Sequence, residues 1–498
     1  MHKLARLDQR YLWHPFTQMR DWFKAEPIVI VQGKGACVQD ARGRRYLDAN
    51  ASIWTNLHGH NQPLINRALR RQLRKIAHSS ALGLANEPAS VLAEQLVQTA
   101  QRPFKETGRR TARVALRFQP ELAKVFYSDD GSTAMEVALK LAYEYARRTG
   151  LARKPRFLSL TEAYHGDTLG AVSLGHIDLF HKAYAGLVFR TETVMAPYCY
   201  RCRFNRALPE RADARCYRRC RWECVAHVEA RFGSGKKRDQ PVTALVIEPL
   251  IQGAAGMIPQ PPGWLRQVAD IARAHRALFI ADEVMTAFGR AGGHPLATGG
   301  LLACHQEGVQ PDLVALAKGL TGGYLPLAAT LATRAIFDVF LGDYAEFKTF
   351  FHGHSYTGNQ LGCAAALASL QLLQTRASRQ ARARLETELR QNLSGLWTFP
   401  SVGDIRQVGL IAGIELVQDW RTRRPFGLRQ RVGARVCEAM ARRGVLTRPI
   451  GDVVVLMPPY ATTPSQVRKI VEALADSVAE VSAQPGLQGV GSQNRPRG

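Results

Sequence analysis

The sequence predicts an α/β fold in which a mostly parallel sheet carries helices on both faces. Two observations predict it: apolar runs of strand length recur between residues 124 and 330, and stretches of helical periodicity separate them. Parallel strands need a long crossover connection, usually a helix, so this alternating order favours a parallel sheet. The chain has 498 residues, of which 46% are hydrophobic and 22% charged, as in ordinary globular proteins.

The first predicted element is a small antiparallel hairpin, because "GKGACVQDARGRRYLDA" alternates and contains glycines. Central strands follow at "KVFYSDD", "RFLSLTEAY", "TALVIEPLIQG", "ALFIADEV" and "DLVALAKG". The helices between them include "GSTAMEVALKLAYEYARR" and "PGWLRQVADIARAH", in which apolar residues recur every three or four positions. From about Leu361 the chain is helix-rich, and then "VGDIRQVGLIAGIELV" and "VLTRPIGDVVVLMPPY" predict further strands.

This order predicts a large domain and a smaller α+β domain built from both chain ends. We expect residues 1–70 and 361–482 to form the small domain and residues 71–360 the large one, with a Cys- and Arg-rich insertion at about 199–240. Residues 483–498 are polar and rich in Gly and Gln, which predicts a disordered tail.

Polar residues follow the carboxyl ends of the central strands. Open α/β sheets bind ligands just outside these ends, so we expect the polar residues to converge on one crevice. They are Ser128, Asp129, Thr161, Glu248, Asp282, Glu283 and Lys318.

Three of these ends suggest a specific chemistry. Gly131 and Ser132 begin a helix directly after a strand, where free N–H groups bind anions, although Ser is also an ordinary N-cap. Lys318 follows an apolar run with no carboxylate nearby in sequence, and a desolvated lysine amine can form a Schiff base with an aldehyde. Asp282, on a neighbouring strand, can keep a pyridine nitrogen protonated. Together these groups are what a pyridoxal phosphate site requires.

Several longer motifs carry a resemblance to a known family. They are "WHPFTQM", "YHGDTLGAVSLG", "DEVMTAFGR", "AKGLTGGYLPLA", "HGHSYTGNQ" and "TRPIGDV". The chain resembles class III (ω-type) aminotransferases of fold type I over nearly its whole length, the insertion and the tail excepted. Within them it is similar to the enzymes of biotin synthesis that convert 8-amino-7-oxononanoate to 7,8-diaminononanoate. The resemblance implies pyridoxal 5'-phosphate as cofactor and a homodimer with shared active sites. A cytoplasmic location is expected separately, because the sequence shows neither a membrane span nor a secretory signal.

The resemblance also implies roles for individual residues. Lys318 would be the Schiff-base lysine, Asp282 the partner of the pyridinium nitrogen, and Tyr164 would lie against the cofactor ring. Gly131 and Ser132 would bind the phosphate, which Gly353, His354 and Ser355 would close from the other subunit. The substrate pocket would include Phe16, Ile53, Trp54, Tyr164, Lys318 and Gly353, with Arg448 binding a substrate carboxylate through its planar guanidinium.

The amino donor is the open point of this resemblance. S-adenosylmethionine is the usual donor, but S-adenosylmethionine-dependent members usually carry Tyr where Phe16 stands and a Trp pair where Ile53 and Trp54 stand. The sequence around Phe16, "HPFTQM", resembles the branch of the family that uses lysine as the donor instead. Met285 replaces a glutamine common in ornithine-type and γ-aminobutyrate-type relatives, which argues against those substrates. We expect S-adenosylmethionine, with lysine or another class III ω-aminotransferase activity as alternatives.

The insertion contains five cysteines: Cys199, Cys202, Cys216, Cys220 and Cys224. Four thiolates could hold a structural zinc, but the spacing is irregular and the second half predicts one helical stripe. A reduced surface loop is therefore the other interpretation, and no metal is assigned.

The net charge of +26 leaves a basic, zinc-stabilised nucleic-acid-binding protein as a hypothesis of a different class. The arginines are spread along the chain, which favours solvated helix faces and no nucleic-acid partner. No apolar run is long enough to predict a membrane span, and the N-terminus lacks the apolar region of a secretory signal.

Overall fold

A seven-stranded sheet forms the centre of the large domain in this computed structural model, which describes residues 1–105, 120–236, 241–292 and 301–484. Only β12 runs antiparallel to its neighbours, and the other pairings in the sheet are parallel. The predicted mostly parallel sheet is therefore confirmed. Its spatial order is β4 (Leu122–Ser128), β12 (Ala328–Thr333), β11 (Leu313–Leu316), β10 (Leu278–Asp282), β7 (Val242–Ile247), β5 (Arg156–Leu160) and β6 (Glu192–Val194).

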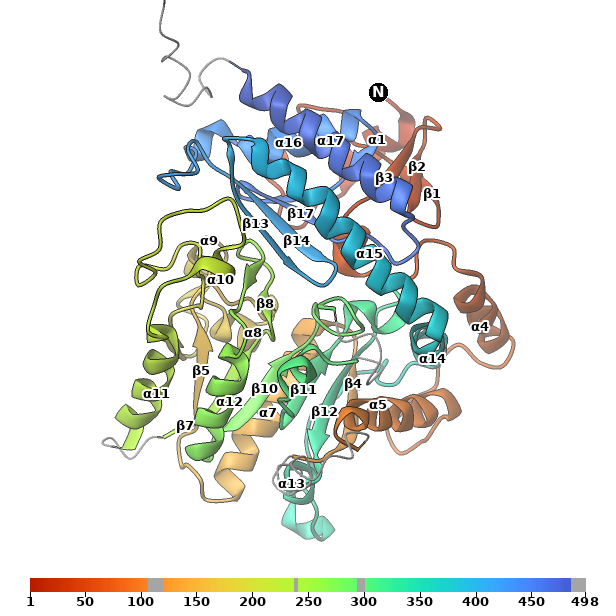
Figure 1. The fold of residues 1–498 in the computed structure, drawn as a ribbon. Helices are drawn as coiled ribbons and strands as arrows, with labels where there is room; N and C mark the ends of the chain where they lie inside the picture. The colour runs from red at the N-terminus through yellow and green to blue at the C-terminus, as the bar shows by residue number, and fades with distance from the viewer. Residues whose placement is uncertain (106–119, 237–240, 293–300, 485–498) are drawn as a thin grey trace, which may run out of the picture.

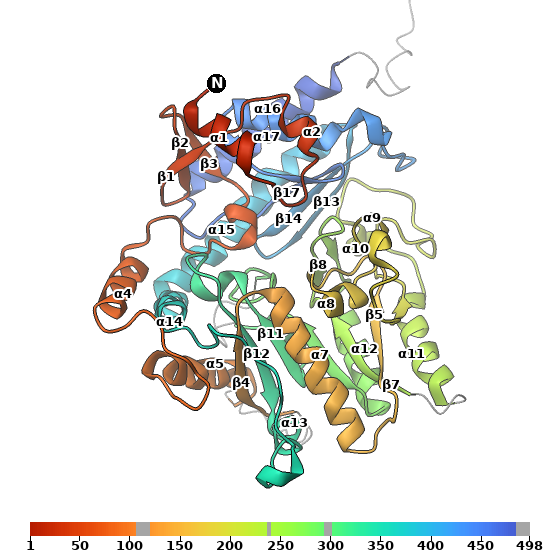
Figure 2. The ribbon, with the colours of Figure 1, turned by 180° about the vertical axis from the view of Figure 1, so that it is seen from behind.

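Helices cover both faces of this sheet (Figures 1 and 2). One face packs against α5 (Glu87–Lys105), α11 (Glu223–Lys236) and α12 (Trp264–Ala274), and the other against α7 (Gly131–Arg148) and α8 (Leu169–Leu174). Successive residues of β10 alternate between the two cores: Phe279 belongs to the first and Ile280 to the second. Burial on both faces is the reason why the central strands are continuous apolar runs.

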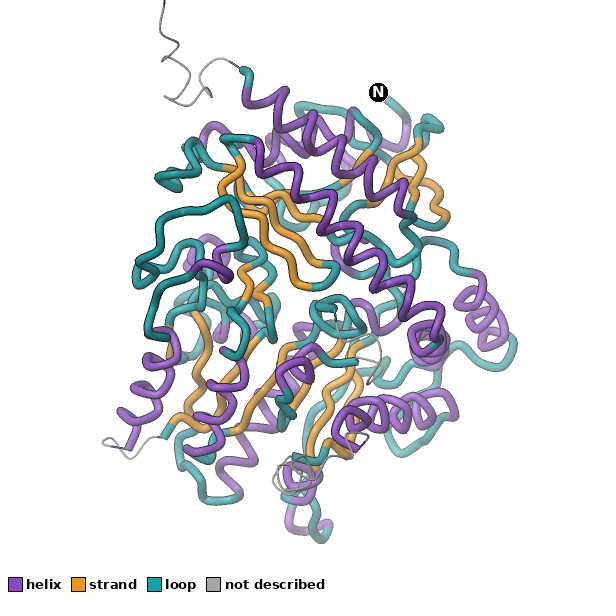
Figure 3. Tube along the Cα trace, in the orientation of Figure 1, coloured by secondary structure: helices purple, strands orange, loops and turns teal. Residues whose placement is uncertain are grey.

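Elements from both chain ends lie together in two further sheets, which we describe as the small domain. Its first sheet is the expected antiparallel hairpin, β1 (Ile30–Lys34), β2 (Cys37–Asp40) and β3 (Arg45–Asp48), to which β15 (Val445–Leu446) adds in parallel. Its second sheet is antiparallel, in the order β13 (Val402–Val408), β14 (Ile411–Leu416), β17 (Val453–Leu456) and β16 (Pro449–Ile450). Helices α15 (Arg376–Ser394), α16 (Val432–Arg442) and α17 (Pro464–Ser482) share a core with this sheet (Figure 3).

Shorter elements connect the two domains and lie at their edges. Helices α4 (Pro63–Leu73) and α14 (Gln360–Gln374) pack against each other.

No helix in the described ranges is long and apolar enough to cross a membrane. The predicted disordered tail falls almost wholly outside the described residues. The remaining short elements are α1 (Lys3–Tyr11), α2 (Met19–Trp22), α3 (Ala51–Trp54), α9 (Asp178–His181), α10 (Ala214–Tyr217), α13 (Arg334–Asp338), β8 (Ile251–Gln252) and β9 (Ile258–Pro259).

The insertion differs from its predicted form. The expected helical stripe through Cys216, Cys220 and Cys224 is wrong, because α10 ends at Tyr217 and α11 begins at Glu223. Trp222, between them, has a φ of 61°, which a right-handed helix does not accommodate. Nor is the segment a simple surface loop, since Cys199 and Cys224 are buried. The cysteines are free thiols, and no group of metal-binding side chains occurs among the described residues.

Candidate active site

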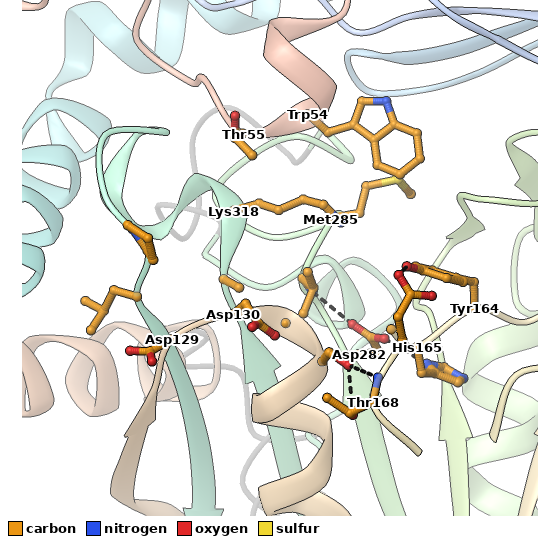
Figure 4. A pocket seen from close by; sticks show the side chains of 18 of the residues that line it. Trp54, Thr55, Asp129, Asp130, Tyr164, His165, Thr168, Asp282, Met285 and Lys318 are labelled. Carbon is orange, nitrogen blue, oxygen red and sulfur yellow. Dashed lines mark hydrogen bonds and ion pairs between the residues drawn. The ribbon is translucent and has the colours of Figure 1, made fainter. Parts of the chain in front are cut away.

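A pocket of about 710 Å³ lies at the carboxyl ends of the central strands, where the fold predicts a ligand site. Trp54, at the end of α3, lies above Lys318, whereas Asp130, directly before α7, and Thr168, directly before α8, lie below it (Figure 4). Six of the residues to which the resemblance gives a role line it: Trp54, Gly131, Ser132, Tyr164, Asp282 and Lys318.

Lys318 follows β11 and extends across the pocket (Figure 4). Its Nζ has no hydrogen-bond or ion-pair partner among the described residues, and lies 5.1 Å from the centroid of the Trp54 ring. Burial lowers the pKa of this amine, although the charges of Asp282 and Glu248 oppose the shift. The site therefore favours a neutral, nucleophilic amine at Lys318 more than water does.

Asp282, at the end of β10, is held by two donors. Its Oδ2 lies 2.7 Å from Nδ1 of His165, and its Oδ1 accepts from the backbone N–H of Val284 at 3.1 Å. Burial opposes a charge on His165, but the hydrogen bond and charge of Asp282 outweigh it, so the pKa of the imidazole is raised. These two hydrogen bonds fix the orientation of the carboxylate, which is what a partner for a protonated ring nitrogen needs.

Sequence reasoning did not identify His165. It follows Tyr164 in "YHGDT", so the motif contains it, but nothing local to the motif indicates that its side chain turns toward Asp282. Nε2 of His165 is buried and has no hydrogen-bond partner in the described part of the chain.

Glu248, at the end of β7, is the second buried carboxylate of the pocket. It accepts hydrogen bonds from the backbone N–H groups of Tyr164 at 3.2 Å and Gly253 at 2.8 Å. Burial raises the pKa of Glu248 to about 7. The Tyr164 hydroxyl donates to Oδ2 of Asp167 at 2.9 Å, and its ring stacks on His181 with the centroids 6.1 Å apart. Glu248 and Asp167 therefore fix both ends of Tyr164.

The prediction that all the strand-end residues converge on one crevice is only partly right. Asp129, Glu248, Asp282 and Lys318 line the pocket, but Ser128, Thr161 and Glu283 do not. Glu283 is completely buried and turns away, accepting from Thr286 Oγ1 and from the backbone N–H groups of Ala303 and Cys304. Its role is therefore structural, because consecutive side chains at a strand end point in opposite directions.

The start of α7 forms the floor of the pocket. A Cβ atom on Gly131 would lie 2.6 Å from Cγ1 of Val284, so a larger residue does not fit there without a shift. Ser132 Oγ lies 2.8 Å from Thr168 Oγ1 and accepts from the Thr168 backbone N–H at 2.9 Å, which joins the starts of α7 and α8. The positive end of α7 suits a phosphate. Because Lys318 and Asp282 line the same pocket, these residues fit pyridoxal phosphate.

The other predicted residues lie outside the pocket of a single chain. Phe16 and Ile53 are 55% and 45% exposed, and Nη2 of Arg448 donates to the Phe16 carbonyl at 2.9 Å. Gly353 has open space at its Cβ position, Nδ1 of His354 lies 3.3 Å from Oδ2 of Asp129, and the Ser355 carbonyl accepts from His78.

Comparison with known proteins gives consistent similarities. Residues 19–478 match the family model described as aminotransferase class III. The chain is 47% identical over 478 residues to the adenosylmethionine-8-amino-7-oxononanoate aminotransferase of Geobacter sulfurreducens, covering 95% of this chain and 97% of the relative. The protein of the same name from Anoxybacillus flavithermus is 42% identical over 486 residues, with 98% of both chains covered.

Solved structures show the same similarity. The crystal structure of the adenosylmethionine-8-amino-7-oxononanoate aminotransferase from Methanocaldococcus jannaschii superimposes with a TM-score of 0.83 at 36% identity, covering 96% of this chain and 98% of that one. The ω-transaminase of Pseudomonas jessenii in complex with PMP, the aminated form of the cofactor, gives a TM-score of 0.83 at 25% identity, covering 97% of this chain and 98% of that one.

Proposed function

Since this chain belongs to the class III aminotransferase family, we propose that it transfers an amino group from S-adenosylmethionine to 8-amino-7-oxononanoate, giving 7,8-diaminononanoate in biotin biosynthesis. The enzyme depends on pyridoxal phosphate, as the family does. The observation that carries the proposal is the full-length similarity to relatives of that name in a chain whose pocket is lined by both a buried lysine and a buried aspartate. It would act as a cytoplasmic homodimer.

Each part of the cofactor has a proposed partner in the pocket. The start of α7, at Gly131 and Ser132, would hold the phosphate, and Asp282 would hold the pyridine nitrogen; all three residues line the pocket. Tyr164, which also lines it, would lie against the ring. When bound, pyridoxal phosphate supplies an electron sink for the substrate carbon and carries the amino group between donor and acceptor.

Lys318 has two proposed tasks. Its amine would anchor the cofactor through the aldehyde group, and the free amine would act as the base that moves a proton at the substrate carbon. Both tasks need a neutral amine, which the lowered pKa of Lys318 favours. His165 supports the reaction indirectly: its Nδ1 donates to Asp282 and keeps that carboxylate oriented.

Arg448 is the proposed ligand of a substrate carboxylate. Its guanidinium donates to the Phe16 carbonyl and is exposed, so donors remain for a carboxylate. The Phe16 ring packs edge-on against Phe180, which in turn packs against Tyr164. A substrate bound at Arg448 would therefore lie beside a row of three aromatic rings, Phe16, Phe180 and Tyr164, that ends at the proposed cofactor site.

The proposed function is tested by product formation. Purified enzyme loaded with pyridoxal phosphate should convert 8-amino-7-oxononanoate and S-adenosylmethionine to 7,8-diaminononanoate, identified by mass spectrometry. Lys318→Ala should remove turnover while leaving the circular dichroism spectrum unchanged, because no other group in the pocket can both anchor the cofactor and carry the proton. Turnover by Lys318→Ala near the wild-type rate would refute the assignment of this lysine.

Lysine is the second candidate donor, favoured by Phe16 and Ile53. The pocket residue Trp54 retains one aromatic surface, whereas Phe16 lacks a hydroxyl and Ile53 lacks a ring; a lost aromatic partner costs about 0.5–1.5 kcal/mol beyond area burial. Pyridoxamine phosphate released after a single turnover with each donor alone distinguishes them. Formation with lysine only would replace S-adenosylmethionine in the proposal. Phe16→Tyr should improve the use of S-adenosylmethionine if residue 16 contributes to the difference.

A further inference from the structure

Residues 51–54 form an unusual turn beside the pocket. Four successive residues with side chains have positive φ: 46° at Ala51, 49° at Ser52, 60° at Ile53 and 70° at Trp54. In this left-handed helical conformation the Cβ atom of an L-residue approaches the following carbonyl oxygen, and a β-branched residue such as Ile53 is the least suited to it. Such a conformation persists only where the surroundings hold it, and it is typical of functional sites.

Two buried side chains hold the turn. The Asp48 carboxylate accepts from the Ser52 backbone N–H at 3.0 Å and from the Ser52 hydroxyl at 2.9 Å, and it also pairs with His60 at 2.9 Å. The Asn50 side-chain carbonyl accepts from the indole N–H of Trp54 at 2.8 Å. Asp48 and Asn50 are only 6% and 5% exposed, so these hydrogen bonds are shielded from competing water.

The chain that leaves the turn lies directly against the segment that carries Lys318. A Cβ atom on Gly323 would lie 2.8 Å from the backbone N of Asn56, and one on Gly319 would lie 2.9 Å from Cδ1 of Leu57. The turn and the Lys318 segment thus approach each other closely at two glycines. A change in the turn would therefore displace atoms next to the reactive amine.

The turn directs the Trp54 ring across the pocket (Figure 4). One face of the ring system lies toward Nζ of Lys318, 5.1 Å from the centroid, and its Cζ3 atom lies 3.4 Å from the Cβ position of Gly253. Because Asn50 occupies the single N–H of the indole, the ring offers a substrate only apolar and π surface.

We propose that Asp48 and Asn50 are positioning residues for amino transfer: by holding residues 51–54 in the left-handed turn they fix the Trp54 ring as a rigid wall over Lys318. The wall suits the methylene chain of an aliphatic substrate and makes no hydrogen bond to it. The substrate part of this inference rests on the proposed function, whereas the fixed geometry of Trp54 does not.

The test compares Asn50→Leu in two backgrounds. Leu has a similar size but no acceptor, so the Trp54 ring should become mobile. The fluorescence of Trp54 is the difference between each protein and its Trp54→Phe counterpart. Acrylamide should quench this fluorescence at least twofold more strongly in Asn50→Leu than in wild type. With the substrates that the enzyme turns over, kcat/KM should fall about five- to tenfold, the size of one lost hydrogen bond. In Trp54→Phe, which has no N–H to hold, Asn50→Leu should change kcat/KM less than twofold.

Ser52→Ala provides the second variant. It removes the hydroxyl bond to Asp48 and leaves the bond between Asn50 and Trp54, so its quenching and its loss of kcat/KM should lie between those of wild type and Asn50→Leu. Ser394→Ala, on α15 far from the pocket, is the matched control and should match wild type. Unchanged quenching in Asn50→Leu, or an equal loss of kcat/KM in both backgrounds, overturns the proposal. If Asn50→Leu does not fold, unchanged quenching and activity in Ser52→Ala overturns it. Because quenching needs no substrate, a wrong substrate assignment and a wrong role for Asn50 give different results.

Discussion

Burial sets the charge state of the residues around Lys318. Glu248 and Lys318 both lie where water is scarce, and desolvation moves both pKa values toward the neutral form: upward for the carboxyl and downward for the amine. Asp282, in the same pocket, accepts a hydrogen bond from His165. One pocket therefore combines a carboxylate that is hydrogen-bonded to an imidazole with two groups whose pKa values burial shifts toward the neutral form, an arrangement typical of catalytic sites.

The raised pKa of Glu248 predicts a pH dependence of stability. Its folded-state pKa of about 7 lies above the ordinary value of 4.5, so the folded protein binds this proton more tightly than the unfolded chain. The stabilising contribution is fully present below pH 4.5 and is lost as the pH rises through about 7. The free energy of unfolding in urea is measured for cofactor-free wild type and for Glu248→Gln at a series of pH values. As the pH rises through this window, the wild type should lose stability relative to Glu248→Gln, by at most about 1.4 kcal/mol per pH unit. A pH-independent difference would place the titration elsewhere.

Strand β13 connects three parts of the molecule through one buried cation. Arg406 is completely buried; its Nη1 contacts Asp404 at 3.0 Å and Glu415 at 2.6 Å, and its Nε donates to the Gly256 carbonyl at 3.0 Å. Arg201 of the insertion also donates to Glu415, at 2.9 Å. The small-domain sheet, the turn between β8 and β9, and the insertion therefore share one ionic network.

Arg406→Met should destabilise the protein by about 3–5 kcal/mol, because it leaves the buried Asp404 without its cation and Glu415 with Arg201 alone. Arg201→Met, whose side chain is 30% exposed, should cost about 1 kcal/mol or less. Denaturant unfolding at pH 7.5 measures both variants. A cost for Arg406→Met no greater than that of Arg201→Met would contradict a structural role for the network.

At the scale of the whole molecule, the segment 351–356 has large aromatic side chains that are exposed in a single chain. Phe351 and Tyr356 are 73% and 59% exposed, and they flank Gly353, His354 and Ser355. Exposed aromatic residues grouped in this way are typical of an interaction surface. They support the proposal that each chain completes the phosphate site of its partner.

Mixing two inactive variants tests this shared site. If Ser355 acts across the dimer, a heterodimer of Ser355→Ala and Lys318→Ala has one site with both defects and one with neither. Activity should then return to about half of the wild-type level per dimer, provided that Ser355→Ala alone is strongly impaired at limiting cofactor. Subunit exchange is verified by native mass spectrometry with one tagged chain. No recovery in verified heterodimers would mean that Ser355 serves its own chain.

The sequence by itself determined the features that depend on local spacing. Strand and helix periodicity predicted the central sheet and the helices on it, because residues two or four apart share a face whatever surrounds them. An amine after an apolar strand predicted the role of Lys318, and glycine at a helix start predicted the phosphate end.

Only the tertiary structure decided which side chains meet. His165 and Asp282 are 117 positions apart, and their contact depends on how two strands align in the sheet. Glu283 follows Asp282 directly yet turns away from the pocket, and Trp222 interrupts the stripe of cysteines with a positive φ. The left-handed turn at residues 51–54 is disfavoured by its own sequence, so local propensity predicts against it. Buried hydrogen bonds to Asp48 and Asn50 and close packing against Gly323 stabilise it, and these interactions exist only once the chain has folded.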